Sequence, residues 1–96
     1  MRAYAKRPGE PWGFIEIANE LKPLQDFVGG HIEAVTLTSD IVLLCNEEGL
    51  IRGLPYGGTV LRHKYVGPLL LVGVDGEEFT DVSWQAELFT EEAERG

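Results

Sequence analysis

Hydrophobic and polar positions follow two periods in the first third of the chain. Side chains alternate in residues 2–6 and again in 12–17, as in strands, and the first of these suits a short edge strand. Apolar residues then recur every three or four positions from Leu21 to Val28. This spacing predicts a short amphipathic helix, which Gly29 ends because glycine tolerates the left-handed conformation.

The middle of the chain carries the clearest strand signals. A β-branched segment at 31–37 is followed, after a short turn, by residues 41–45, which are apolar at every position. Such a short connection forces an antiparallel hairpin, and the uninterrupted apolar run indicates a central strand buried on both faces. After an Asn-Glu-Glu-Gly turn at 46–49, residues 50–54 are predicted to form a third strand.

The last part of the chain predicts one further strand and a second helix. Residues 56–59 are expected to form a flexible surface loop, and 60–64 show no clear period. A strongly apolar strand follows at 66–74. Its Gly67-Pro68 pair suggests an edge entry or a bulge, because proline cannot donate to the ladder. Residues 84–94 are predicted as a helix. Its expected apolar stripe is Trp84, Leu88 and Phe89.

These elements add up to an α+β fold. We expect one domain, residues 1–96, with a mostly antiparallel sheet of five to six strands and two helices packed on one face. A strand edge near Arg2 or Val66 would be free to pair with a second copy, so a homodimer is also expected as an option.

Composition and charge narrow the classes of function. No apolar run is long enough to span a bilayer, and no signal peptide is recognisable, so we expect no membrane partner. The single cysteine, Cys45, has no partner for an internal disulfide, which fits a cytoplasmic location. The net charge of −8 argues against direct nucleic-acid binding, because phosphates require an excess of basic residues.

The acidic excess allows two interpretations. Solubility is the simpler one. The other is a DNA mimic that inhibits a nucleic-acid enzyme, for which carboxylates should lie in rows along one face. The acids instead cluster in the turns near Glu47 and Asp75 and in the tail after Thr90, where solvated charges normally lie.

Patterns of catalytic or metal-binding residues are missing from the sequence. It contains no GxSxG, HExxH or phosphate-loop motif, and no Cys/His cluster with metal spacing. Cys45 lies in the most apolar strand, where a thiol acts as a small hydrophobe with a raised pKa. We therefore expect no catalytic residue, metal or cofactor, with an enzyme of unrecognised site as an alternative.

The best candidate for a binding site is the segment 52–64, RGLPYGGTVLRHK. Flexible glycines let backbone amides approach an anion, guanidinium groups match phosphates, and a tyrosine can stack on a base. The competing interpretation is a solvated loop whose bases offset nearby acids. The candidate ligand-binding residues are Arg52, Tyr56, Gly57, Gly58, Arg62, His63 and Lys64.

A linked pattern, LQ…VGGHIE…CNEEG…GLP, runs through the chain between about residues 15 and 82. Its members are Leu24, Gln25, residues 28–33, residues 45–49, residues 53–55, and the later Gly67-Pro68 and Asp75-Gly76 pairs. This pattern resembles a family of small proteins from phages, plasmids and integrative elements, a domain of unknown function of the DUF3846 type. The chain departs from it at Tyr56-Gly57-Gly58. The family has no assigned catalytic residues, so the resemblance implies only an accessory protein of a mobile element.

The combined prediction is a small non-enzymatic accessory protein that acts by binding in the cytoplasm of a bacterial host. It would oppose host defence by sequestering a host nucleotide signal or a host protein. The nucleotide version predicts that Arg52, Tyr56, Arg62 and Lys64 line one pocket. The alternatives are the acidic DNA mimic and the enzyme with an unrecognised site.

Overall fold

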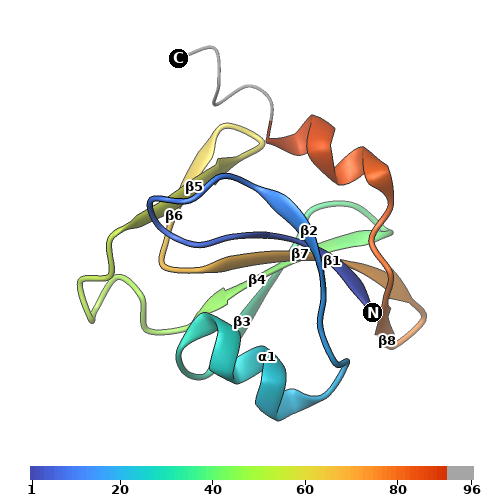
Figure 1. Ribbon diagram of the computed structural model, residues 1–96, viewed down its shortest axis with the longest axis horizontal. Coiled ribbons are helices and arrows are strands. Elements are labelled where there is room, and N and C mark those ends of the chain that lie inside the picture. Colours follow the sequence, from blue (N-terminus) through green and yellow to red (C-terminus); the bar gives the residue numbers. More distant parts are fainter. Residues whose placement is uncertain (91–96) are drawn as a thin grey trace.

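The computed structural model describes residues 1–90, so the last residues of the predicted C-terminal helix, 91–94, lie outside the described part. The elements are β1 (Arg2–Lys6), β2 (Gly13–Glu16), α1 (Leu21–Val28), β3 (Ile32–Thr36), β4 (Ile41–Asn46), β5 (Tyr56–Val60), β6 (His63–Val66), β7 (Leu69–Asp75), β8 (Glu78–Thr80) and the 3₁₀ helix η1 (Trp84–Phe89) (Figure 1).

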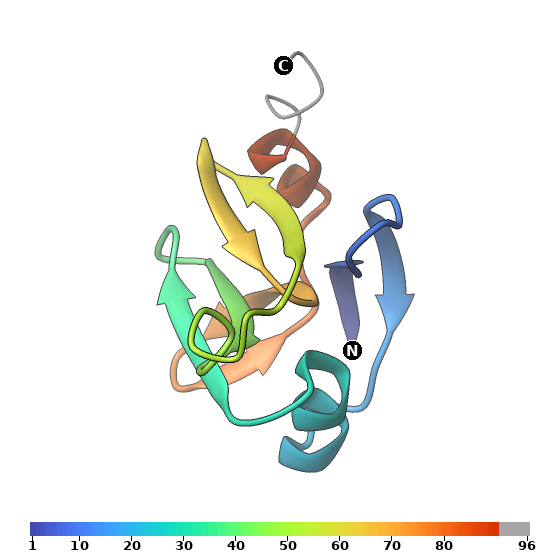
Figure 2. The ribbon, with the colours of Figure 1, turned by 90° about the vertical axis from the view of Figure 1, so that its left-hand side faces the viewer.

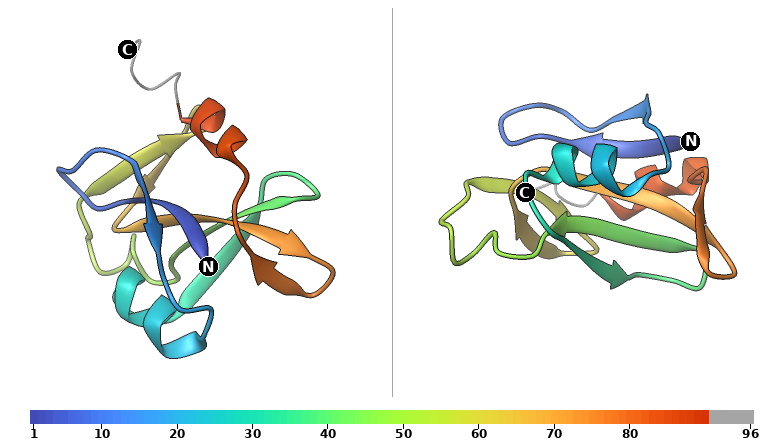
Figure 3. Two further views of the ribbon diagram at one scale, coloured as in Figure 1. Left: turned by 45° about the vertical axis from the view of Figure 1, so that its right-hand side comes forward. Right: turned by 90° about the horizontal axis from the view of Figure 1, so that it is seen from below.

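Six strands form one antiparallel sheet in the order β2-β1-β7-β4-β3, with β8 paired to β7 (Figure 3). The strands β5 and β6 form a separate antiparallel hairpin. The expected α+β fold with a mostly antiparallel sheet is confirmed. The predicted hairpin of β3 and β4 is also confirmed, and Val35 lies opposite Leu43 in its register.

The two central strands are buried on both faces. Every residue of β4 is buried, and so is β7 from Leu69 to Gly73. Alternate side chains point to opposite faces, which divides the core into two clusters, one around Leu43 and Leu71 and one around Leu44 and Leu70. Full burial of one such side chain stabilises the fold by roughly 1.5–3 kcal/mol.

The two helices lie on opposite faces of the sheet, so their predicted placement on one face is wrong. Leu24 and Phe27 of α1 pack on one cluster, whereas Ala86 and Phe89 of η1 join the β5–β6 hairpin over the other. Figure 2 shows α1 at the bottom and both η1 and the hairpin at the top. A sheet whose central strands are apolar on both sides needs a cover on each.

Helix α1 ends as predicted. Gly29 adopts a left-handed conformation with φ 85°, and its N–H donates to the Gln25 carbonyl at 2.8 Å. The buried side chain of Asn46 then ties this helix end to β4, because its Nδ2 donates to the Val28 carbonyl at 3.1 Å. Its Oδ1 accepts the N–H of Glu48 at 2.8 Å and so begins the predicted turn.

The predicted apolar stripe of the C-terminal helix is wrong in part. Trp84 and Leu88 are exposed, whereas Ala86 is buried and Phe89 packs on the core. The reason is the helix type: η1 has three residues per turn, so residues three apart, such as Ala86 and Phe89, share a side. Ser83 caps this helix by accepting the Gln85 N–H at 3.1 Å.

Other expectations about strands also fail. Strand β1 is no edge, because β2 and β7 pair with its two sides, and the outer strands of the path are β2 and β3. The predicted strand at 50–54 is a series of turns, closed by the N–H of Leu54 donating to the Gly49 carbonyl at 2.9 Å. The expected loop at 56–59 belongs to β5 instead.

The glycines of β5 are required by close packing. A Cβ built on Gly57 would lie 1.9 Å from the carbonyl oxygen of Gly67. We predict that Gly57→Ala lowers the free energy of unfolding by roughly 3 kcal/mol, measured by urea denaturation, because the hairpin must move away. Gly13→Ala is the control, since a Cβ there meets nothing within 4 Å. Equal stability of both variants would contradict this packing.

Candidate functional site

The structure disperses the residues of the predicted binding segment. Arg52 lies at the end of α1, where its Nη1 donates to the Gly29 carbonyl at 3.0 Å. This places a cation at a helix C-terminus, a stabilising arrangement. Arg62 occupies the turn between β5 and β6, with His63 exposed beside it. Lys64 lines a cleft on the β6 side. These basic residues therefore do not surround a single pocket.

The glycine pair Gly57-Gly58 is buried within β5 and does not form a flexible cradle. A Cβ on Gly58 would lie 3.1–3.2 Å from side-chain atoms of Leu69, Lys6 and Trp12. Its role is to let the hairpin approach the β1–β2 end of the sheet. Tyr56 lies at the same end, with the Lys6 Nζ 5.7 Å from the centre of its ring.

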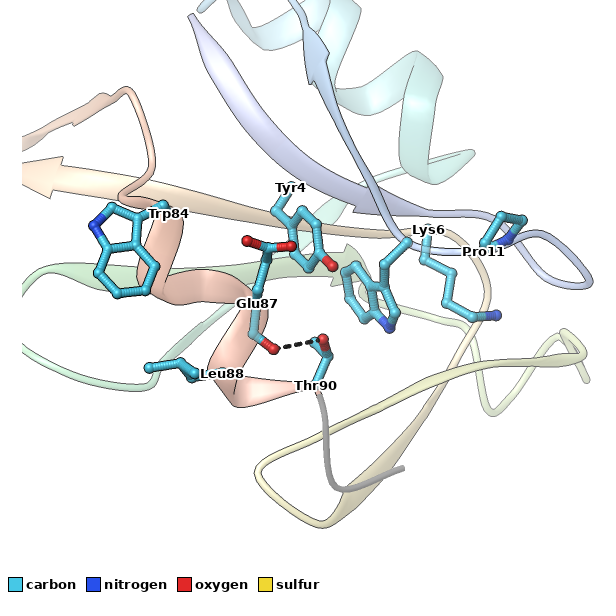
Figure 4. A pocket seen from close by; sticks show the side chains of 8 residues that line it. Tyr4, Lys6, Pro11, Trp84, Glu87, Leu88 and Thr90 are labelled. Atoms are coloured by element: carbon cyan, nitrogen blue, oxygen red, sulfur yellow. Dashed lines mark hydrogen bonds between the residues drawn. The ribbon is translucent and has the colours of Figure 1, made fainter. Parts of the chain in front are cut away.

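An aromatic cleft opens where η1 faces the first two strands (Figure 4). Its volume is about 400 Å³. One wall comes from β1 and the segment that leads into β2, and the other comes from η1 and the residue after it. The lining residues are Tyr4, Lys6, Pro11, Trp12, Trp84, Glu87, Leu88 and Thr90.

The strand wall of the aromatic cleft is a stack of rings. Tyr4 and Trp12 stack with ring centroids 5.1 Å apart and planes 13° from parallel. The ring of Phe14 also packs on Tyr4, with ring centroids 4.6 Å apart, and this contact helps to hold the Tyr4 ring in place. Across the cleft, Trp84 is 63% exposed. The cleft therefore combines fixed rings on one side with an accessible indole on the other.

Two charged side chains line the aromatic cleft. Figure 4 places Lys6 and Trp84 at opposite ends, and Glu87 extends from η1 toward the strand wall. Glu87 is exposed, and Lys6 is half-buried. The cleft thus presents aromatic faces, one cation and one carboxylate to a ligand.

Sequence reasoning missed this site because its walls lie far apart in the chain. In the sequence, Trp12 begins an alternating segment that is typical of a strand, and Trp84 belongs to the predicted apolar stripe of a helix. These two residues are the only tryptophans of the sequence. The structure brings them to one cleft through the pairing of β1 with β7 and the return of η1 over the same face. The exposed Trp84 became recognisable only once the 3₁₀ geometry of η1 was known.

A second cleft lies between β3 and β6, and we call it the Leu50 cleft. Its volume is about 420 Å³. Its lining includes Glu33, Val35, Cys45, Glu47, Leu50, Ile51, Lys64 and Tyr65. Burial, together with the nearby charge of Glu33, raises the pKa of the Cys45 thiol to about 11. Burial also raises the pKa of Tyr65, so both groups are neutral at physiological pH.

Within residues 1–90, no group of three or more His, Cys, Asp or Glu side chains is placed to hold a metal ion. In the same residues, neither helix has the length and hydrophobicity to span a bilayer.

Comparison with protein families matches residues 1–94 to the domain of unknown function DUF3846. The chain belongs to the DUF3846 family. The match confirms the family resemblance of the sequence and extends it over nearly the whole chain. Searches of the curated proteins and of the solved structures found no match to this DUF3846 protein.

The raised pKa of Cys45 has a consequence for stability at high pH. Above about pH 9 the thiol of the unfolded chain ionises, while the buried thiol stays protonated until about pH 11. The stabilising contribution is present below pH 9 and is lost as the pH rises through this window. A shift of this size corresponds to at most roughly 2–3 kcal/mol.

We therefore predict that Cys45→Ala weakens the pH dependence of unfolding between pH 9 and 11, measured by urea denaturation at each pH. Tyr65→Phe is the companion variant, because the raised pKa of Tyr65 acts in the same direction at higher pH. Identical pH profiles for Cys45→Ala and the unmodified protein would show that the thiol is not shielded from water.

Proposed function

We propose that this protein is a non-enzymatic binding protein that holds a small anionic nucleotide in the aromatic cleft. The observation that carries the proposal is the gathering of Tyr4, Trp12 and Trp84 around one cavity with an ammonium group at one end. Aromatic rings stack on any nucleobase, with roughly 1–3 kcal/mol per base. The ammonium group of the half-buried Lys6 at the end of such a cleft suits a phosphate group.

Glu87 adds a preference among the bases. A carboxylate accepts hydrogen bonds, so it favours a base edge that carries an exocyclic amine, as in adenine, guanine and cytosine. The net charge of −8 acts against long polyanions, whose binding needs many cations. The combination favours a mononucleotide or a small cyclic nucleotide over DNA or RNA.

The biological context of the proposal is an accessory protein of a phage or mobile element, active in the cytoplasm of a bacterial host. This context is supported by the sequence pattern, which resembles proteins from phages, plasmids and integrative elements. In that setting, sequestering a nucleotide removes a signal on which host defence depends. Function by occupancy needs only affinity and abundance, which fits a chain of 96 residues.

The alternatives receive less support from the described residues. The acidic turns at Glu47-Glu48 and at 75–78 follow β4 and β7, which are antiparallel, so the two turns lie at opposite ends of the sheet. A DNA mimic instead needs a row of carboxylates along one face. For an enzyme, Cys45 and Tyr65 are described groups with shifted pKa values, and both values move away from neutrality.

Titration calorimetry with a panel of linear and cyclic nucleotides measures binding to the aromatic cleft. Trp84→Ala should weaken binding roughly tenfold, because one stacking face is lost. Lys6→Ala should weaken it by a similar factor through loss of the phosphate contact. Trp84 is exposed, so its replacement should leave the fold intact, which circular dichroism checks.

Lys22→Ala is the matched control, because Lys22 is an exposed lysine of α1 that pairs with Asp26 at 2.9 Å, away from the cleft. It should bind like the unmodified protein. Absence of heat with every nucleotide of the panel would overturn the proposal, as would equal losses in Lys6→Ala and Lys22→Ala. Chromatography of the released ligand separates binding from catalysis: an unchanged nucleotide agrees with sequestration, and a converted one favours the enzyme.

A further inference from the structure

The Leu50 cleft has a rim of exposed apolar side chains that the nucleotide proposal does not use. Leu50 and Ile51 are 83% and 88% exposed, the highest values among the exposed large hydrophobic residues of the described chain. They line the cleft together with Val35, Tyr65 and Val66. An apolar rim next to an apolar-lined cavity is typical of a surface that binds another macromolecule.

The segment that carries Leu50 and Ile51 is held in place by hydrogen bonds. The N–H of Arg52 donates to the Glu48 carbonyl at 2.8 Å, and the N–H of Leu54 donates to the Gly49 carbonyl at 2.9 Å. At its base, Asn46 anchors the turn to the end of α1. The backbone that carries the two side chains is therefore held in place, which limits the backbone entropy lost when a partner binds.

The strand beside this cleft is an edge of the main sheet. Strand β3 pairs with β4 on one side and is the last strand in the sheet order. The His31 carbonyl accepts from Glu47 and the Leu37 N–H donates to Ile41, so the odd-numbered residues point their backbone groups toward β4. By the alternation of a strand, the backbone groups of Ile32, Ala34 and Thr36 point outward. Such an edge is a template for an added strand.

The charges around this edge select the partner. Glu33 and Glu47 line the cleft, Glu48 follows them in the exposed turn, and the lining contains one basic residue, Lys64. The ion pairs of the described residues join Met1 with Glu16 and Lys22 with Asp26, so neither uses Glu33 or Glu47. An acidic rim around an apolar floor is complementary to a segment that is both basic and apolar.

We infer that the Leu50 cleft and the edge of β3 bind an extended basic segment of another protein, which adds to the sheet as a strand. Side chains of Glu33 and Val35 share the cleft face of β3. The added strand therefore places a lysine or arginine beside Glu33 and, two residues along, an apolar side chain beside Val35 and Ile51. Strand addition supplies affinity through the backbone, and the alternate side chains supply specificity.

A second copy of the chain fits this surface less well. Each copy carries a net charge of −8. Pairing of β3 from one copy with β3 from another would also put the Glu33 residues of both copies in one continuous sheet. Like charges placed together in this way oppose pairing. The inference is independent of the aromatic cleft, which lies between η1 and the first two strands.

The test uses a capped, fluorescein-labelled peptide of sequence Lys-Thr-Val-Thr-Lys-Thr-Val and fluorescence anisotropy. The protein should bind this peptide and not the version with both lysines replaced by glutamate. Ile51→Ser should weaken binding roughly tenfold through lost apolar contact. Glu33→Lys should abolish the preference for the basic peptide. Leu21→Ser is the control, since Leu21 is 66% exposed on α1, on the other face.

A separate variant of the protein tests whether the peptide binds as an added strand. Ala34→Pro removes an outward N–H that β4 does not use, and proline is tolerated on edge strands. It should lower affinity at least fivefold while circular dichroism stays unchanged. A peptide with alternate backbone amides N-methylated should lose affinity in the same way, whether or not Ala34→Pro folds. Binding without charge preference, equal loss in Leu21→Ser, or dimerisation through β3 seen by sedimentation would overturn the inference.

Discussion

The burial of β4 and β7 on both faces is the constraint on which the rest of the structure depends. These antiparallel partners place Leu43 beside Leu71 on one face and Leu44 beside Leu70 on the other. Each face must be covered, because leaving one leucine side chain exposed to water lowers the stability of the fold by roughly 1.5–3 kcal/mol. Helix α1 covers one face, with Met1 and Ile17 packed against the same cluster. The opposite face is covered by two separate pieces, the β5–β6 hairpin and η1.

Both clefts lie at the borders of this divided cover. The aromatic cleft forms where η1 meets the β1–β2 end of the sheet, and the Leu50 cleft forms where β6 lies over β3 and β4. Their chemistry differs. The first combines stacked rings with one lysine and one glutamate, which suits a small planar anion. The second combines apolar side chains with an acidic rim and an open strand edge, which suits a basic peptide.

Several features of the fold were predictable because local chemistry decides them. The uninterrupted apolar run at 41–45 indicated a central strand, and Gly29 indicated the end of α1. Other features were not, because tertiary contacts override local preference. The turn between β5 and β6 uses Leu61 and Arg62 at φ 49° and 70°, although glycine and asparagine are the residues that favour such turns. The hairpin therefore left no turn signal in the sequence.

The sequence by itself determined the family, the antiparallel pairing of β3 with β4, and the burial of Cys45, since these depend on residue type and short-range spacing. Only the tertiary structure decided which residues share a site. Lys6, Trp12 and Trp84 meet because β1 pairs with β7 and η1 returns over the same face. Arg52 and Lys64 are close in sequence, but the Arg52 guanidinium bonds the end of α1, whereas Lys64 of β6 lines the Leu50 cleft. Contacts between distant segments are set by how the sheet is covered, and no local pattern encodes that choice.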